Sequence, residues 1–169
     1  MKKQKGFSLI ELLIVVAIIL IIAAIAIPNL LKAKMAANES SAAGAIRTVN
    51  TAQVSYSTLF PQVGYSATLG ALGGPAAACA PPALSTIAQA CLIDELLSGN
   101  SVPVFVKSGY TFGMGAGAVL GPPLVTYFVT ATPVSLGTSG QNMFCSDQSG
   151  VVRHSPTGAG CGVGSLALQ

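Results

Sequence analysis

One carboxylate stands in a run of residues that is otherwise suited to a membrane. Glu11 precedes Leu12 to Ile27, a stretch in which every residue is apolar. With the apolar residues just before Glu11, the segment is about 20 residues long, which is enough to cross a bilayer as a helix. A charge in such a segment costs about 3 kcal/mol even on insertion scales, so an intramembrane carboxylate indicates a function. Ion pairing is the chemistry that fits Glu11, because a buried charge is tolerated when an opposite charge meets it.

The other titratable residues do not form a pattern that is typical of catalysis. Adjacent Asp94 and Glu95 would point in different directions on a helix, and Asp147 falls in an expected turn, where Asp bonds locally. His154 is expected at the surface near the end of a strand. The sequence contains no G-x-S-x-G, P-loop or HExxH string. We therefore expect no enzyme, no catalytic residues, no cofactor and no metal ligands.

The string Gly6-Phe7-Ser8-Leu9-Ile10-Glu11, which follows a short basic leader, resembles the type IV prepilin signature. The close resemblance covers roughly Lys2 to Lys34. It implies that a prepilin peptidase cuts between Gly6 and Phe7 and methylates the new N-terminus at Phe7. It also implies that Glu11 pairs with the N-terminal amine of a neighbouring subunit, so that Phe7 and Glu11 are the expected assembly residues. By the same resemblance, Pro28 marks a kink where the helix bends or locally melts in a filament.

Composition supports a chain that contacts lipid or other copies of itself. Only 8% of the 169 residues are charged and 51% are hydrophobic, whereas soluble domains use about 25% charged residues. The formal charge of +3 comes from the leader, because without its three lysines five basic residues face five acidic ones. Lysines before an apolar span stay cytoplasmic, so the rest of the chain is expected outside.

Four cysteines lie on the side of the span that is expected to be exported, where disulfides form: Cys79, Cys91, Cys145 and Cys161. Four cysteines allow three pairings. We favour Cys79–Cys91 and Cys145–Cys161, because each pair closes a short local loop rich in Gly or Pro. The spacings are too wide for the close ligand pairs of a zinc site.

The hydrophobic periodicity predicts one long helix from about Phe7 to about Leu59. Its first half is apolar all round, and its second half has an apolar stripe at three- and four-residue steps, from Leu31 and Met35 to Tyr56. Pro61 is expected to end it. A loop over 62–82, a short helix over 87–97 and an antiparallel sheet follow, with strands expected at 110–112, 124–131, 142–145 and 151–154. This is an α+β fold in which a long N-terminal helix packs on a small antiparallel sheet, and the resemblance implies the same pilin fold.

The expected organisation is a leader at 1–6, a transmembrane and filament-core helix at 7–28, and an exported globular domain at 29–169. The resemblance implies an inner-membrane precursor that becomes part of an extracellular pilus. Its partners would be copies of itself, prepilin peptidase, the inner-membrane pilus assembly machinery and, before assembly, the membrane. Twitching, adhesion, DNA uptake and electron transfer all remain open as the filament's role.

Three alternatives carry less weight. Ala24-Ile25-Ala26 resembles a secretory cleavage site, which would release a soluble domain starting at Ile27. A major pseudopilin of a type II secretion system would share the N-terminal motif. However, such subunits carry an acidic calcium loop, and Asp147 is the only acid after Glu95. Lys32, Lys34 and Arg47 are too scattered for a basic stripe, although repetition along a filament leaves nucleic-acid binding open.

Overall fold

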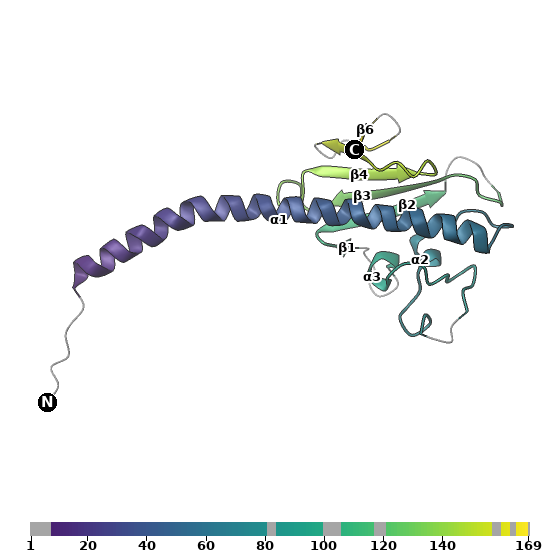
Figure 1. The fold of residues 1–169 in the computed structure, drawn as a ribbon, viewed down its shortest axis with the longest axis horizontal. Helices are drawn as coiled ribbons and strands as arrows, with labels where there is room; N and C mark the ends of the chain where they lie inside the picture. Colours follow the sequence, from purple (N-terminus) through teal and green to yellow (C-terminus); the bar gives the residue numbers. More distant parts are fainter. Residues whose placement is uncertain are drawn as a thin grey trace. The chain divides into compact units, whose positions relative to one another are not determined.

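The computed structural model describes residues 8–80, 84–99, 106–116, 121–156, 160–162 and 165–168. The chain divides into two compact units, Met1–Lys34 and Met35–Gln169. Helix α1 spans Leu9–Leu59, two short helices follow it, and six strands complete the chain (Figure 1). The prediction of an α+β fold, with a long N-terminal helix and an antiparallel sheet, is confirmed.

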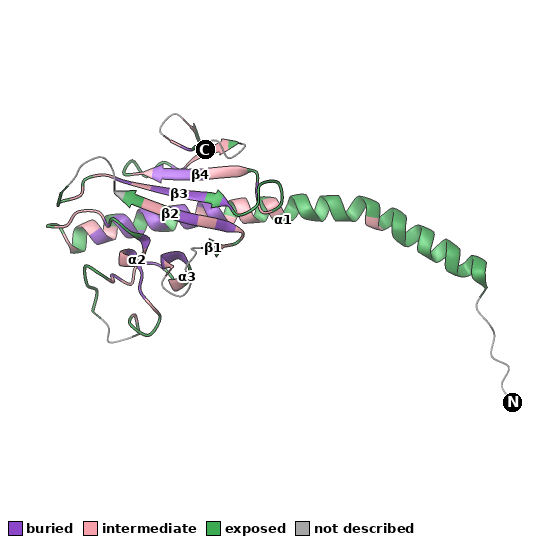
Figure 2. Ribbon diagram, turned by 180° about the vertical axis from the view of Figure 1, so that it is seen from behind, coloured by how far each residue is buried: buried purple, intermediate pink, exposed green. Residues whose placement is uncertain are grey.

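The part of α1 in the first unit presents apolar side chains in every direction. From Leu9 to Leu31 the large hydrophobic side chains are between 46% and 79% exposed, and this part of the ribbon is almost entirely green in Figure 2. Its mean hydropathy reaches 3.3 over an 18-residue window, which is apolar enough for a membrane span by composition and length. The helix continues through Pro28.

The second part of α1 has a buried stripe at alternating four- and three-residue steps: Ala42, Ile46, Val49, Gln53 and Tyr56. This spacing puts all five on one face of a helix. The sequence placed Leu31 on the stripe as well, but Leu31 is 49% exposed and the buried residues of α1 begin at Ala42. The predicted end of the helix is confirmed, since α1 stops at Leu59 and Pro61 follows.

The sheet is a six-stranded antiparallel meander in which each strand pairs with the next along the chain. The strands are β1 Val106–Lys107, β2 Tyr110–Ala116, β3 Tyr127–Pro133, β4 Asn142–Asp147, β5 Arg153–Pro156 and β6 Leu166–Ala167. Tyr127, Val129 and Ala131 alternate with less buried residues along β3. This alternation is typical of a sheet with one face on a core.

Within the second unit, α1 lies across the face of the sheet formed by β2, β3 and β4 (Figures 1 and 2). The buried stripe of α1 and the inward side chains of these strands form a single hydrophobic core. Tyr110 and Phe144 meet in it with ring centroids 5.8 Å apart. The sheet therefore supplies the apolar surface that the second part of α1 needs.

Two short helices, α2 Leu69–Leu72 and α3 Glu95–Ser98, lie between α1 and the sheet in the sequence. The prediction of a helix over 87–97 was wrong. The backbone of Ala90 and Leu92 donates instead to the carbonyls of Ala71 and Leu72, at 2.9 and 2.7 Å. A helix begins only after Asp94, whose carboxylate caps it at the amide of Leu97.

The predicted strands were largely correct, with shifts at their ends. The strand expected to start at 124 starts at Tyr127, because Leu124 forms an isolated bridge with Gly64. The strand expected at 151–154 spans Arg153–Pro156 instead. The two-residue strands β1 and β6 were not predicted, since two residues carry no readable alternation.

Candidate assembly site

Glu11 lies in the first turn of α1 and has a partner within its own chain. Its Oε2 accepts a hydrogen bond from the backbone N–H of Ser8 at 2.9 Å. Ser8 immediately precedes the helix and Glu11 is its third residue, so this contact is the carboxylate half of a capping box. A negative charge is also favoured here by the helix dipole. The S-x-x-E spacing of Ser8 and Glu11 is the sequence signal for this cap.

The expected cleavage and methylation residues, Gly6 and Phe7, lie outside the described residues. The structure therefore does not bring Glu11 and Phe7 together or hold them apart. Pro28 lies inside α1 with helix on both sides of it, and its role as a kink in a filament stays a prediction.

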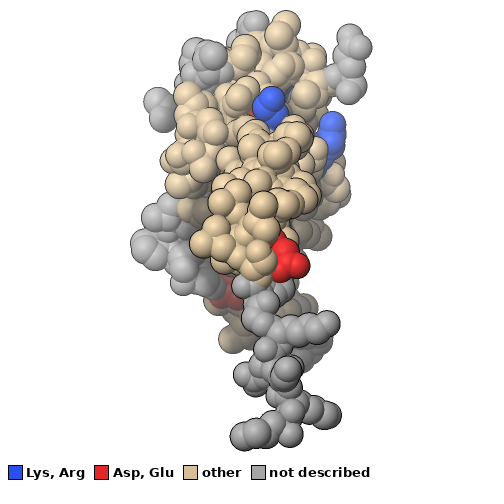
Figure 3. Space-filling view, turned by 90° about the vertical axis from the view of Figure 1, so that its left-hand side faces the viewer, with Lys and Arg blue, Asp and Glu red and all other residues tan. Residues whose placement is uncertain are grey.

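The exposed apolar helix is the most unusual surface of the chain. Soluble monomers rarely expose contiguous apolar patches larger than a few hundred Å². On the face seen in Figure 3, charged side chains are sparse and most of the described surface is tan. A surface of this kind fits lipid, or close packing against other apolar helices, rather than water.

A polar cluster joins α1 to strands β3 and β4. Asn50 donates through Nδ2 to Ser146 Oγ at 2.9 Å and to the carbonyl of Gly150 at 3.1 Å. Its Oδ1 accepts from the hydroxyl of Tyr127 at 3.0 Å. Burial, followed by interactions with Tyr65 and Asp147, raises the pKa of Tyr127 to about 12. Every side-chain polar group of Asn50 is thus used to hold the helix on the sheet.

Gln53 makes a second pair of buried hydrogen bonds, which join α1 to the loop that follows it. Its Oε1 accepts from the amide of Ser66 at 2.8 Å, and its Nε2 donates to the carbonyl of the same residue at 2.9 Å. This pair of bonds fixes the loop after α1 to the buried face of the helix. Asn50 and Gln53 were missed by sequence reasoning, although an amide side chain on an apolar stripe is the available signal.

The structure joins Cys79 to Cys91 and Cys145 to Cys161, with Cα atoms 5.6 and 5.8 Å apart. These are the two pairings that the sequence favoured. The first closes the loop between α2 and α3, and the second ties β4 to the segment after β5. Both therefore hold parts of the domain with little regular structure.

The acidic residues outside the apolar helix serve local structure. Burial raises the pKa of Asp94, but hydrogen bonds from Lys107 and Leu97, with the charge of Lys107, outweigh it and lower the pKa. Burial also raises the pKa of Asp147, and hydrogen bonds from Ser149 and the nearby Arg153 more than reverse this. Arg153 Nη1 lies 3.3 Å from Asp147 Oδ2. In the described part of the chain, no three His, Cys, Asp or Glu residues are grouped as metal ligands.

His154 differs from the surface residue that was expected. It lies on β5 opposite Phe144 and is partly buried. Its Nδ1 is buried and has no hydrogen-bond partner. The sequence could not show this, because the burial depends on how β5 packs between β4 and β6 and beside α1.

Comparisons with known proteins concern the N-terminal segment. A family model described as the prokaryotic N-terminal methylation motif matches residues 1–27. The type IV wide pilus major component PilA4 of Thermus thermophilus is 62% identical over 40 residues, which cover 24% of this chain and 30% of that protein. The type IV major pilin protein PilA of Myxococcus xanthus is 50% identical over 54 residues, which cover 32% of this chain and 24% of that protein. No solved structure matches the chain.

The chain thus matches less than a third of the length of either relative. The matched motif spans Gly6, Phe7 and Glu11. Beyond it, the long helix and the antiparallel sheet form a pilin-like architecture. In its N-terminal segment this chain is therefore similar to type IV pilins, and its architecture is pilin-like.

Proposed function

We propose that the chain is a structural subunit of a type IV pilus, made as a membrane-anchored precursor and polymerised after its leader is removed. The observation that carries the proposal is the exposed apolar part of α1, most of which lies within the methylation motif. The three leader lysines hold the N-terminus in the cytoplasm. Prepilin peptidase then cuts after Gly6 and methylates Phe7, and the globular domain stays outside the inner membrane.

Polymerisation moves the apolar helix from lipid into a filament core made of identical helices. Packing between helices and the exclusion of water supply the driving force. At about 25 cal/mol per Å², burying a helix as apolar as this one contributes on the order of tens of kcal/mol before opposing terms. Head-to-tail contacts that do not close into a ring produce an open filament. Extracellular pili are therefore the final location.

Glu11 sets the register of the subunits by pairing with the N-terminal amine of the next one. Within one subunit the carboxylate already has a neutral partner, the amide of Ser8. A neutral partner does not balance the charge, so an incoming amine offers a stronger bond in an apolar core. The cap keeps the carboxylate hydrogen-bonded until that amine arrives.

Two substitutions separate the cap from the ion pair. Glu11→Gln keeps an acceptor for the Ser8 amide but removes the charge, because Gln also serves in a capping box. Glu11→Ala removes both. We expect both variants to be processed normally and to give at least about tenfold fewer sheared filaments, because each loses a charged pair. Normal filament yield with Glu11→Gln and low yield with Glu11→Ala would show that only the cap matters.

Processing is tested by the N-terminus and intact mass of protein sheared from cell surfaces. A methylated Phe7 start is expected, and Gly6→Ala is expected to leave uncut precursor in the membrane. Protein that starts at Ile27 would instead be a secreted soluble domain. That result would overturn the filament proposal.

A further inference from the structure

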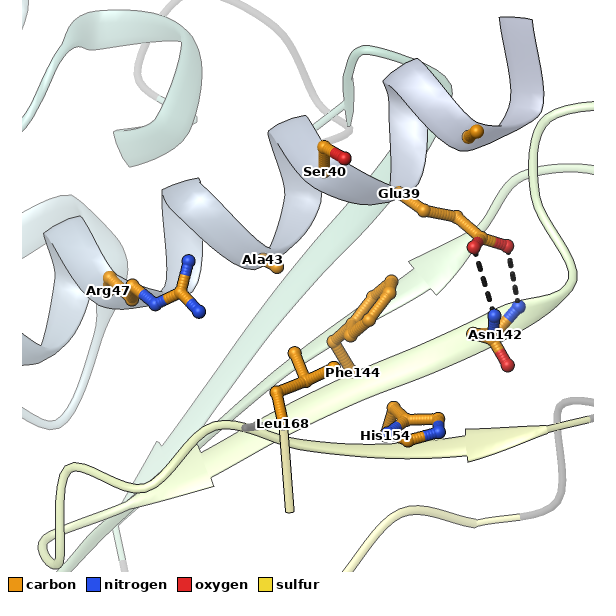
Figure 4. A pocket seen from close by; sticks show the side chains of 9 residues that line it. Glu39, Ser40, Ala43, Arg47, Asn142, Phe144, His154 and Leu168 are labelled. Atoms are coloured by element: carbon orange, nitrogen blue, oxygen red, sulfur yellow. Dashed lines mark hydrogen bonds between the residues drawn. The ribbon is translucent and has the colours of Figure 1, made fainter. Parts of the chain in front are cut away.

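A pocket of about 410 Å³ lies in the globular unit between α1 and strands β4 and β5 (Figure 4). Its volume is within the range of small-molecule sites. Ala43, Phe144 and Leu168 supply apolar walls, and Arg47 and His154 enter from the helix side and the strand side respectively. The filament function proposed above does not use this pocket.

The two ends of the pocket differ in how their charges are satisfied. At one end, Glu39 accepts three hydrogen bonds, from the amides of Gln141 and Asn142 and from Asn142 Nδ2, at 2.7, 3.1 and 2.9 Å. Toward the other end, the guanidinium of Arg47 has no hydrogen bond or ion pair with any described residue. The pocket therefore combines a carboxylate that is bound to the strand with an exposed cation that no described residue pairs.

His154 adds a directional donor. Its Nδ1 is buried without a partner, and an unpaired buried N–H costs more than an unpaired lone pair that no proton occupies. Because no acceptor meets Nδ1, Nε2 is the ring nitrogen that can offer an N–H to a ligand. Nε2 is not among the buried atoms without a partner, and no described residue is hydrogen-bonded to it, so it is accessible to a ligand.

A second copy of the chain has no spare side-chain carboxylate in its described globular unit to fill this role. Glu39 and Asp147 are held as described above, and Asp94 is bound by Leu97 and Lys107. Glu95 also has an interaction of its own. These carboxylates are already engaged, which favours an anion from a different molecule as the partner of Arg47.

We propose that this pocket binds a small organic carboxylate with a short apolar body. The carboxylate pairs with the Arg47 guanidinium, which suits planar carboxylates. The body lies against Phe144 and Leu168, and the Nε2–H of His154 donates to the head group. The fixed negative charge of Glu39 orients the ligand, because it repels the carboxylate from the opposite end of the pocket.

The test uses the fact that the chain has a single histidine. The carbon-bound ring protons of His154 give one set of NMR signals that needs no assignment. The full chain in a non-ionic detergent is titrated with hexanoate, with acetate as the head group alone, and with hexanamide as the neutral body. We expect a saturable shift with hexanoate, at least about tenfold weaker binding of acetate, and no saturable shift with hexanamide.

Arg47→Gln removes the cation, and Lys34→Gln is the matched control, because Lys34 is also an exposed cation of α1 but does not line the pocket. We expect hexanoate binding to weaken at least about tenfold in the first variant and to be unchanged in the second. Equal binding by Arg47→Gln, equal binding of hexanamide, or shifts that never saturate would each overturn the proposal. An unchanged thermal unfolding midpoint verifies that the variants are folded.

Discussion

Glu39 on α1 and Asn142 at the start of β4 are joined by two hydrogen bonds although they lie 103 residues apart. Glu39 Oε2 accepts from Asn142 Nδ2 at 2.9 Å, and Oε1 accepts from the Asn142 amide at 3.1 Å. The dashed lines in Figure 4 show the helix side chain reaching down to the strand. This contact fixes the start of β4 next to Glu39 on the helix.

Replacing Glu39 by alanine should lower the free energy of unfolding by about 1–3 kcal/mol, because two backbone amides and one side-chain amide lose a charged acceptor. Thermal unfolding followed by tyrosine fluorescence would measure the change, since all four tyrosines lie after residue 50. Thr48→Ala is the control, because the exposed Thr48 hydroxyl bonds only to a carbonyl of its own helix. Equal stability of the two variants would contradict a clamp at Glu39.

The bond between Asn50 and Tyr127 should show coupling in a double-mutant cycle. Asn50→Ala leaves the buried Tyr127 hydroxyl without its acceptor, and Tyr127→Phe removes that hydroxyl. We expect the double variant to be less destabilised than the sum of the single variants by about 0.5–2 kcal/mol. Additive losses measured by urea unfolding would mean that the hydroxyl finds another partner.

Stability should fall above pH 10. The pKa of Tyr127 is about 12 in the folded chain, against a reference value of 10.0, and burial also raises the pKa values of Tyr56 and Tyr110. Between these values the unfolded chain releases phenolic protons and the folded chain keeps them, so rising pH favours unfolding.

The loss of stability caused by Tyr127 is complete only above the pKa of this residue in the folded chain, and it is absent below pH 10. Tyr127→Phe should reduce the drop in unfolding free energy between pH 9 and 12 by on the order of 2 kcal/mol. Urea unfolding at both pH values would measure it. An unchanged pH dependence in this variant would assign the effect to other groups.

Loss of the Cys145–Cys161 disulfide should destabilise the sheet. The bond closes a separation of 16 residues, and a loop of this length corresponds to about 3 kcal/mol. Changing both residues to alanine should raise hydrogen exchange in β4 and β5. The matching change at Cys79 and Cys91 should leave exchange in those strands unaltered. Equal hydrogen exchange in β4 and β5 in the two variants would contradict the expectation that only the Cys145–Cys161 disulfide stabilises these strands.

Sequence periodicity was sufficient for the elements that are long or regular. The apolar stripe from Ala42 to Tyr56 and the proline at 61 defined the second part of α1, because a helix repeats its environment every three or four residues. The β-branched and aromatic residues within 124–131 similarly identified most of β3. The N-terminal motif was readable because its residues are contiguous.

Contacts between distant segments could not be read in this way. The residues around Glu39 do not indicate that Asn142 is its partner. Likewise, the residues around Asn50 do not indicate Tyr127 or Ser146. The segment 87–97 was assigned to a helix from its composition, but its amides bond to the carbonyls of residues 71–73 instead. In this segment tertiary hydrogen bonds decided the local conformation, and local propensity did not.

The strand order of the sheet affects how quickly the domain can form. Every strand pairs with the one before it in the chain, so no pairing must wait for a strand made much later. Loop closure is least costly between near neighbours in sequence, and folding is faster when contacts are local. As the chain is made from its N-terminus, strands can therefore be added to α1 in the order in which they emerge, with few unpaired edges exposed at any stage.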